Sequence, residues 1–163
     1  MSYAELALGA SNVLLGSAVG AGVSQSLFVM PHWFSSPPES LPEPDESTRS
    51  LRAFWGPLQA GSALALGTAW ALNRSDPRRR PLLSVAGGLW VGTAALTAAY
   101  FAPELLRLIR SGQQLGAEEV KRRSKRWQNL NLGRLAAMAG MALFASLAAI
   151  RRPAPRIRRL WMH

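Results

Sequence analysis

The stretch "PLLSVAGGLWVGTAALTAAYFAP", residues 81–103, contains no charged residue and decides the class of fold. A helix needs roughly 20 consecutive, mostly apolar residues to cross the hydrocarbon core of a membrane. A helix of a soluble bundle would instead show polar residues at every third or fourth position on its outer face, and this stretch does not. We therefore predict a transmembrane helix over residues 82–108.

Three further runs share this character. Residues 6–38 and 53–73 carry no charge, and Arg134 is the only charged residue between positions 127 and 150. In all, 48% of the residues are hydrophobic and 17% are charged, an unusual balance for a soluble protein of this size. We predict a single all-α membrane domain over residues 1–163, a four-helix transmembrane bundle with helices at 5–30, 53–73, 82–108 and 127–150.

The first run is expected to be a retained helix and not a secretory signal. Such a signal starts with a basic segment, and the earliest basic residue is Arg49. The run contains a G-x-x-x-G pair at Gly16 and Gly20, and the third run contains another at Gly88 and Gly92. Small residues at this spacing let helix backbones approach closely, so we expect helix packing at both pairs.

The segments between the runs differ in kind. Residues 31–52 hold many prolines and acidic residues and are predicted to form a loop, and residues 73–81 a tight basic turn. Residues 104–126 mix leucines with Arg and Lys, which predicts a continuation of the third helix and then an interfacial amphipathic segment, broken at Gly112 and Gly116. Residues 151–163 form a basic tail.

The net charge of +10 arises beside the helix ends. Basic residues in that position attract anionic lipid headgroups, so we expect membrane lipids and not nucleic acid as the partner. Each side of the membrane would receive the same number of basic residues outside the helices, and the positive-inside rule therefore does not choose an orientation. The acidic, proline-rich first loop suits the outside, which favours both termini in the cytoplasm.

Several kinds of chemistry are excluded by composition. The chain has no cysteine, so disulfides, thiolate catalysis and iron–sulfur clusters are ruled out. Its two histidines, His32 and His163, are too few for a haem or zinc site built from several imidazoles. The helices also hold almost no acids for a di-iron site. We therefore expect no metal and no cofactor.

Polar residues at the mouth of the fourth helix are the main candidates for a site. Trp127, Asn131 and Arg134 fall at positions i, i+4 and i+7 and so share one face of a helix. In one interpretation, Asn131 and Arg134 line a polar pocket inside the bundle. In the other, Trp127 belongs to the interfacial aromatic belt and Arg134 extends back to the lipid headgroups.

His32 is the candidate base, since its ordinary pKa lies close to neutrality. It follows the first helix in "MPHWF", and the alternative is an interfacial histidine beside Trp33 in an exposed loop. Gln25 and Tyr100 lie near other helix ends, where they line the same volume or hydrogen-bond between helices. Glu104 is interpreted as a helix-end charge and not as a catalytic acid.

A first helix that ends near a proline and three further segments resemble the anthrone oxygenase-like membrane proteins: "LRAFWGPLQAGSALAL" at 51–66, "YFAPELLRLI" at 100–109 and "RWQNLNLGR" at 126–134. The resemblance spans almost the whole chain, and its sharpest element is W-x-x-x-N-x-x-R at Trp127, Asn131 and Arg134. The chain departs from the family at Glu104, where members often have Asn after the proline. For the characterised members, the resemblance implies oxidation of an anthrone to an anthraquinone by molecular oxygen without a cofactor.

The hypothesis that follows is a cofactor-independent oxygenase for anthrone-like or other aromatic substrates. His32 would act as the base, Asn131 and Arg134 as oxyanion donors, and Trp127 or Trp33 as the stacking wall. The competing hypothesis is a non-enzymatic membrane protein, either a small-molecule carrier or an accessory subunit, in which these residues hold helices together. A transporter is a weaker third hypothesis, because it would need a homo-oligomer to supply a path.

Overall fold

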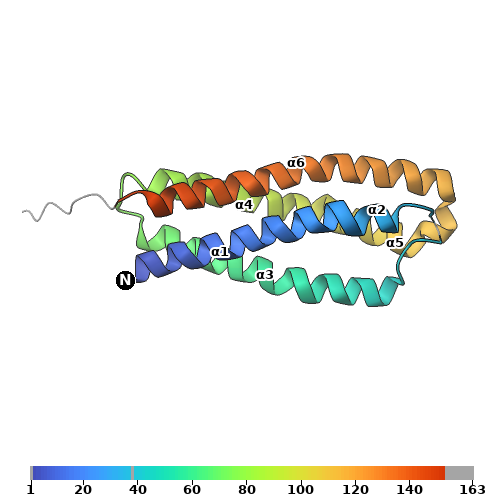
Figure 1. The fold of residues 1–163 in the computed structure, drawn as a ribbon, viewed down its shortest axis with the longest axis horizontal. Coiled ribbons are helices and arrows are strands. Elements are labelled where there is room, and N and C mark those ends of the chain that lie inside the picture. Colours follow the sequence, from blue (N-terminus) through green and yellow to red (C-terminus); the bar gives the residue numbers. More distant parts are fainter. Residues whose placement is uncertain (1, 38, 153–163) are drawn as a thin grey trace, which may run out of the picture.

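The computed structural model describes residues 2–37 and 39–152, and every regular element in them is helical. This confirms the all-α prediction. The helices join into four long rods (Figure 1). Their bounds are α1 Tyr3–Ser24, η1 Gln25–Val29 and α2 Met30–Trp33 in the first rod, α3 Pro44–Leu72 in the second, α4 Arg80–Leu96, η2 Thr97–Phe101 and α5 Ala102–Leu115 in the third, and α6 Ala117–Ile150 in the fourth. From position 153 onward, the predicted basic tail lies outside the described residues.

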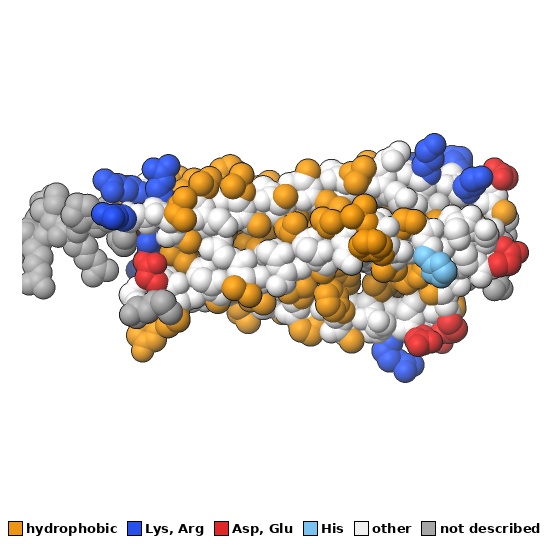
Figure 2. Space-filling model, in the orientation of Figure 1, with side chains coloured by type: hydrophobic (Ala, Val, Ile, Leu, Met, Phe, Trp, Pro, Cys, Tyr) orange, Lys and Arg blue, Asp and Glu red, His pale blue; other side chains and the backbone are white. Residues whose placement is uncertain are grey.

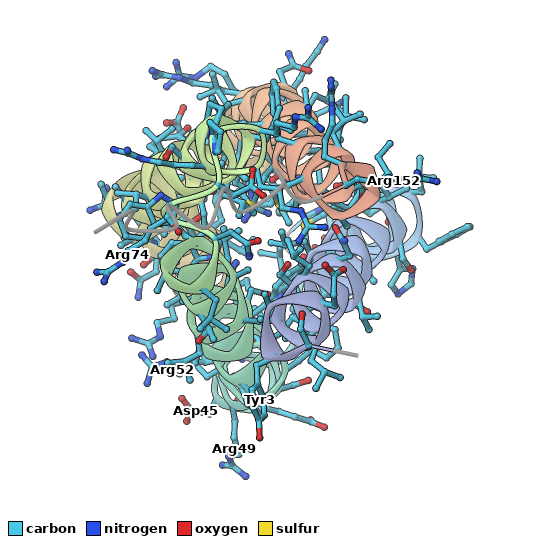
Figure 3. All side chains as sticks on the ribbon, turned by 90° about the vertical axis from the view of Figure 1, so that its left-hand side faces the viewer. Tyr3, Asp45, Arg49, Arg52, Arg74 and Arg152 are labelled. Carbon is cyan, nitrogen blue, oxygen red and sulfur yellow. The ribbon has the colours of Figure 1, made fainter. Side chains whose placement is uncertain are left out.

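The four rods lie side by side around a common axis (Figures 1 and 3). The first rod packs on α3 and on α6, and α4 packs on α6 and on α3, which closes a ring. The start of α1 and the end of α6 lie together at what we call the terminal end (Figure 1). The turn between α5 and α6 marks the opposite end, which we call the hairpin end.

Three helical segments are long and apolar enough to cross a membrane: Tyr3–Trp33, Arg80–Gly112 and Ala117–Ile150. Figure 2 shows charged side chains gathered at the two ends and an apolar band between them, as a membrane protein requires. The α3 helix is not among the three, because Pro57, Gln59 and Ser62 make its run more polar. The fourth predicted span therefore remains a prediction.

The second rod begins earlier than expected. Residues 44–52 were predicted as loop, yet they are the first turns of α3. Pro44 occupies the first turn, where its missing N–H costs nothing, and the Glu43 side chain accepts a hydrogen bond from the Glu46 amide at 2.8 Å. Proline therefore starts this helix, and the connection from α2 is shorter than predicted, because α2 ends at Trp33 and α3 begins at Pro44.

Two rods contain a π-helical segment just before a proline. Pro31 follows η1 by one intervening residue, and Pro103 follows η2 in the same way. The Met30 amide donates to the Gln25 carbonyl and the Ala102 amide to the Thr97 carbonyl, five residues back in each case. A wider turn accommodates the ring and the absent N–H of the proline, and π segments of this kind are frequent at functional sites.

The predicted segment between the third and fourth helices resolves into parts of two rods. The third rod continues as α5 to Leu115, and Gly116, with a φ of 73°, ends this helix. Residues 117–126 are the first turns of α6 and not a separate interfacial helix. Gly112 lies inside α5 and does not break it. A Cβ at this position would collide with the Leu41 side chain.

The expected packing at the G-x-x-x-G pairs is wrong for this chain. Gly16, Gly20, Gly88 and Gly92 have open space around the position of a Cβ. The close approach between the first rod and α6 occurs instead at Gly22, where a Cβ would lie 2.7 Å from a methyl group of Leu135. Spacing alone cannot show which face of a helix meets a neighbour.

The interior consists of two apolar clusters. One, toward the terminal end, includes Leu8, Leu83 and Met138, and the other, toward the hairpin end, includes Phe101 and Trp127. On α6, Arg134 lies between Trp127 of one cluster and Met138 of the other. The polar site described next therefore occupies the junction between two apolar cores.

Candidate functional site

A cavity of about 430 Å³ lies between α3, the η2–α5 segment and α6. This volume is in the range of small-molecule binding sites, roughly 300–1,000 Å³. Most of the wall is apolar or aromatic, and these side chains are Leu51, Trp55, Phe101, Leu105, Leu106 and Trp127. Six polar residues also border the cavity but contribute less of its surface; they are Gln25, Thr48, Arg52, Gln59, Thr97 and Arg134. A wall that is mostly apolar by area suits a flat, weakly polar ligand.

Arg134 is held at this wall by a hydrogen-bond network that connects three rods. Its Nε donates to Asn131 Oδ1 at 2.8 Å, and its Nη1 lies 3.4 Å from Thr97 Oγ1 in η2. Asn131 Nδ2 in turn donates to Ser26 Oγ in η1 at 2.9 Å. Both π segments therefore supply a hydroxyl to the Asn131–Arg134 pair, and these hydrogen bonds fix the orientation of the guanidinium.

Aromatic rings complete the support of Arg134. Its guanidinium carbon lies 5.2 Å from the centre of the Phe101 ring, within the range of a cation–π contact. Trp127 meets Phe101 edge to face with ring centres 5.9 Å apart, and its indole N–H donates to the Phe101 carbonyl oxygen at 2.9 Å. The buried Trp127 thus fixes the ring on which Arg134 lies.

The positive charge of Arg134 has no carboxylate partner in the part of the chain that the structure describes. Arg52 also borders the cavity, but it is exposed and points away from the axis of the rods (Figure 3). Arg134 is therefore the cation on the inner side of the cavity wall. An anion or a carbonyl oxygen that gains negative charge is the complementary group.

A second, much smaller void of about 10 Å³ adjoins the first. Gln59, Thr97 and Arg134 border both spaces. The small void is also bordered by Trp90, whose Nε1 is buried and has no hydrogen-bond partner among the described residues. Arg134 therefore separates an aromatic cavity from a small polar space deeper between the rods.

The structure brings four of the candidate residues together. Trp127, Asn131 and Arg134 lie on the inner side of α6, and Gln25 reaches the same cavity from η1. Asn131 is 3% exposed and does not itself line the cavity, because its amide is engaged by Ser26 and Arg134. Its place is that of a positioning residue behind Arg134.

The other candidates lie elsewhere. His32 is exposed on α2 and does not border this cavity, so the base predicted from the sequence is not brought to Arg134. Trp33 borders a neighbouring groove with Phe54, and Tyr100 contacts the edge of Phe101 without lining the cavity. Physically, α2 extends the first rod past the cavity and carries His32 on its outer side.

Glu104 is paired with Arg123. The two side chains form a two-pronged salt bridge with both N···O distances at 2.7 Å. The pair ties α5 to the first turns of α6. A charge at the end of a helix, as predicted, is thus joined to a neighbouring rod.

Sequence reasoning missed the contribution of α3. Thr48, Trp55 and Gln59 lie at i, i+7 and i+11, the spacing of one helix face, and a glutamine inside an apolar run was the signal. Thr97 and Phe101 had no such signal. They belong to a π segment, where the regular 3.6-residue spacing does not predict which side chains point inward.

No curated protein and no solved structure gives a match to this chain. The model of the anthrone oxygenase family matches residues 47–156. The matched region contains α3 from Ser47 onward, the third rod and α6, and so all of the cavity wall except Gln25. It does not contain His32. Since the match covers well over half of the sequence, the chain belongs to the anthrone oxygenase family.

Proposed function

We propose that this protein is an integral membrane oxygenase that oxidises anthrone-like or other flat aromatic substrates without a cofactor. The observation that carries the proposal is the half-buried guanidinium of Arg134, which lies at the wall of an aromatic cavity and has no carboxylate partner among the described residues. In such a cavity, Trp55 and Phe101 would contact the faces or edges of the ligand rings. The carbonyl oxygen of the ligand would point to Arg134.

The chemistry assigned to this site begins with the loss of a proton from the CH2 group opposite the carbonyl of an anthrone. The enolate that forms places negative charge on the oxygen beside Arg134, where a fixed cation stabilises it. The electron-rich ring carbon then reacts with molecular oxygen. The CH2 becomes a carbonyl that keeps one oxygen atom of O2, and the other oxygen atom leaves as water with the two hydrogens.

The titratable side chains that line the cavity are Arg52 and Arg134, and neither is a base at neutral pH. We therefore assign proton removal to water or hydroxide that enters the cavity, with Arg134 as the group that makes it favourable. His32 as the base remains the prediction from sequence. The pH dependence separates the two: a histidine base gives a rate that levels off above its pKa, whereas a solvent base gives a rate that continues to rise.

Substrate access from the lipid fits the position of the cavity. Leu51 and Trp55 of α3 line one side and Leu105 and Leu106 of α5 line another, and we propose that the cavity opens between these two rods. Anthrones are apolar enough to partition into a bilayer, and a lateral opening would admit them from there. The proposal includes α3 as a fourth membrane crossing, because it runs alongside the three apolar segments (Figure 1).

The test is oxygen uptake and quinone formation by the purified protein in detergent, after subtraction of the spontaneous oxidation of the anthrone. Arg134→Met keeps most of the side-chain volume and removes the charge. We expect it to lower turnover by about 10²- to 10³-fold, as for loss of one oxyanion donor. The matched control is Arg126→Met, an exposed position two turns earlier on α6, which should keep full activity. Wild-type turnover by Arg134→Met would overturn the proposal.

The alternative function is a carrier that binds such molecules without oxidising them. The specific observation in its favour is that the cavity wall in the described residues contains no carboxylate or imidazole. A carrier predicts that an anthrone binds in an Arg134-dependent way while oxygen uptake stays at the spontaneous rate. An oxygenase predicts binding and uptake together.

A further inference from the structure

Gln59 and Arg134 border the same two spaces from opposite sides of the bundle. The α3 and α6 helices lie diagonally across the ring of rods, since each packs on the first rod and on α4 (Figure 3). Both residues line the aromatic cavity and also the adjoining void of about 10 Å³. A void of that size holds roughly one water molecule, so side chains that border both spaces lie where the two spaces meet. We call this place the junction.

Thr97 is the third residue that borders both spaces, and its hydroxyl is already engaged. Thr97 Oγ1 donates to the Thr93 carbonyl oxygen at 2.7 Å and lies 3.4 Å from Arg134 Nη1. Gln25 also reaches the cavity, but it does not border the smaller void. Gln59 and Arg134 are therefore the two side chains to compare at the junction.

The side-chain amide of Gln59 makes no hydrogen bond to a described residue. The residue is half-buried, and its amide nitrogen and oxygen are not fully enclosed by protein, so both remain accessible. Arg134 Nη2 is in the same state, because the hydrogen bonds of Arg134 use Nε and Nη1. The amides of Asn73 and Asn131, in contrast, donate to neighbouring groups at 2.8 and 2.9 Å.

The position of Gln59 in an apolar run makes a free amide costly. Residues 53–73 carry no charge, and the proposed function places α3 in the membrane. A polar group there is destabilising unless it forms hydrogen bonds. One turn later, Ser62 meets this need by donating to the Leu58 carbonyl oxygen at 2.7 Å. Gln59 has no such local bond, and a molecule at the junction is the partner that can supply one.

We infer that Gln59 is a second hydrogen-bond donor to the ligand oxygen that Arg134 binds. This inference rests on the proposed function, which supplies that oxygen: the anthrone carbonyl, which gains negative charge when the CH2 group loses its proton. Gln59 Nε2 and Arg134 Nη2 donate to this one atom from two diagonal rods, as the donors of an oxyanion hole do. The substrate class is then a fused-ring aromatic whose carbonyl lies on the ring that reacts.

The binding test uses two fluorescent probes, anthracene and an anthracene with a carboxylate on its central ring, with the full chain in detergent. We expect Gln59→Leu to weaken binding of the carboxylate about tenfold and to leave anthracene unaffected. Gln59→Glu should weaken the carboxylate further, because its own charge repels the probe and pairs with Arg134. The matched control is Gln128→Leu, a half-buried glutamine of α6 that borders neither space and should match the wild type.

Oxygen uptake with an anthrone gives an independent readout of the same role. A donor to an oxygen that becomes negative stabilises the transition state more than the neutral substrate. Gln59→Leu should therefore lower kcat about tenfold and leave KM nearly unchanged, a smaller loss than in Arg134→Met because a neutral donor is weaker than a charged one. Gln59→Leu removes no hydrogen bond within the described structure, and thermal unfolding checks that the variant is folded.

Equal weakening of both probes by Gln59→Leu, or unchanged binding of the carboxylate, would overturn this inference. Arg134→Met, measured beside it, tests the proposed function separately. Loss of carboxylate binding in Arg134→Met with wild-type behaviour of Gln59→Leu would refute the role of Gln59 and keep the role of Arg134. Selective loss in both variants, with oxygen uptake at the spontaneous rate in the wild type, would keep the pair of donors and refute the oxygenase.

Discussion

Arg79 and Arg134 are both drawn into the space between the rods, but only Arg79 is neutralised there. Arg79 is 2% exposed and makes a salt bridge of 2.8 Å to Glu5. It also donates to Asn73 and, through two nitrogens, to the carbonyl oxygen of Arg151 at 2.7 and 2.9 Å. We call Arg79 and these three partners the terminal clamp.

The clamp joins the start of α1, the turn between α3 and α4 and the end of α6. Every hydrogen bond that orients Arg134, by contrast, goes to a neutral group, Asn131 or Thr97. A buried cation with a carboxylate and backbone partners is a structural element. A cation held in place by neutral groups is not neutralised within the described structure, and this difference separates Arg134 from the terminal clamp and is consistent with the proposed site.

The largest expected effect on stability is at Arg79. Arg79→Met leaves Glu5 and Asn73 without their partner and should lower the free energy of unfolding by about 3 kcal/mol. We take the lower end of the range for a broken buried pair because the Glu5 side chain is 37% exposed and can regain water. Thermal unfolding in detergent measures this, and the exposed neighbour variant Arg78→Met should behave as wild type. An equal loss in both variants would show that general charge, and not the clamp, is responsible.

The next expected effect concerns a carboxylate partner for Arg134, of the kind that Glu5 provides for Arg79. Asn131→Asp places a carboxylate where Oδ1 now accepts from Arg134 at 2.8 Å. Neutralisation of the guanidinium should weaken binding of an anionic or enolate-like ligand about tenfold, while the fold is retained through the new ion pair. Titration with such a ligand checks this, with Asn129→Asp on the exposed side of α6 as the control. Unchanged affinity in Asn131→Asp would mean that the charge of Arg134 is not what the ligand meets.

The smallest expected effect is at the hairpin end. Glu104→Gln removes the negative charge from a two-pronged salt bridge with Arg123. The pair is partly buried, since the side chain of Glu104 is 14% exposed and that of Arg123 is 20% exposed. Such a pair is worth somewhat more than an exposed one, and we expect a loss of about 1 kcal/mol in the free energy of unfolding. Glu118→Gln, an exposed acid nearby, is the control and should change nothing measurable. If Glu104→Gln abolished turnover without loss of stability, Glu104 would belong to the site instead.

Much of the site could be anticipated from residues on a regular helix. Trp127, Asn131 and Arg134 share a face because α6 is an uninterrupted α-helix, and the 3.6-residue period places them correctly. His32 and Tyr100 were harder to place, since His32 follows the π segment η1 and Pro31, and Tyr100 lies within the π segment η2, where the regular 3.6-residue spacing does not predict side-chain direction. The clamp could not be anticipated either, because Glu5 and Arg79 are separated by most of the first two rods.

The sequence by itself determined the helical class and three of the apolar segments, since length and the absence of charge within a run depend on no other part of the chain. It also determined the family, through residues 47–156. Only the tertiary structure decided which arginine is paired with a carboxylate and which borders a cavity. Those properties depend on the neighbours that other rods supply, and a one-dimensional pattern does not contain them.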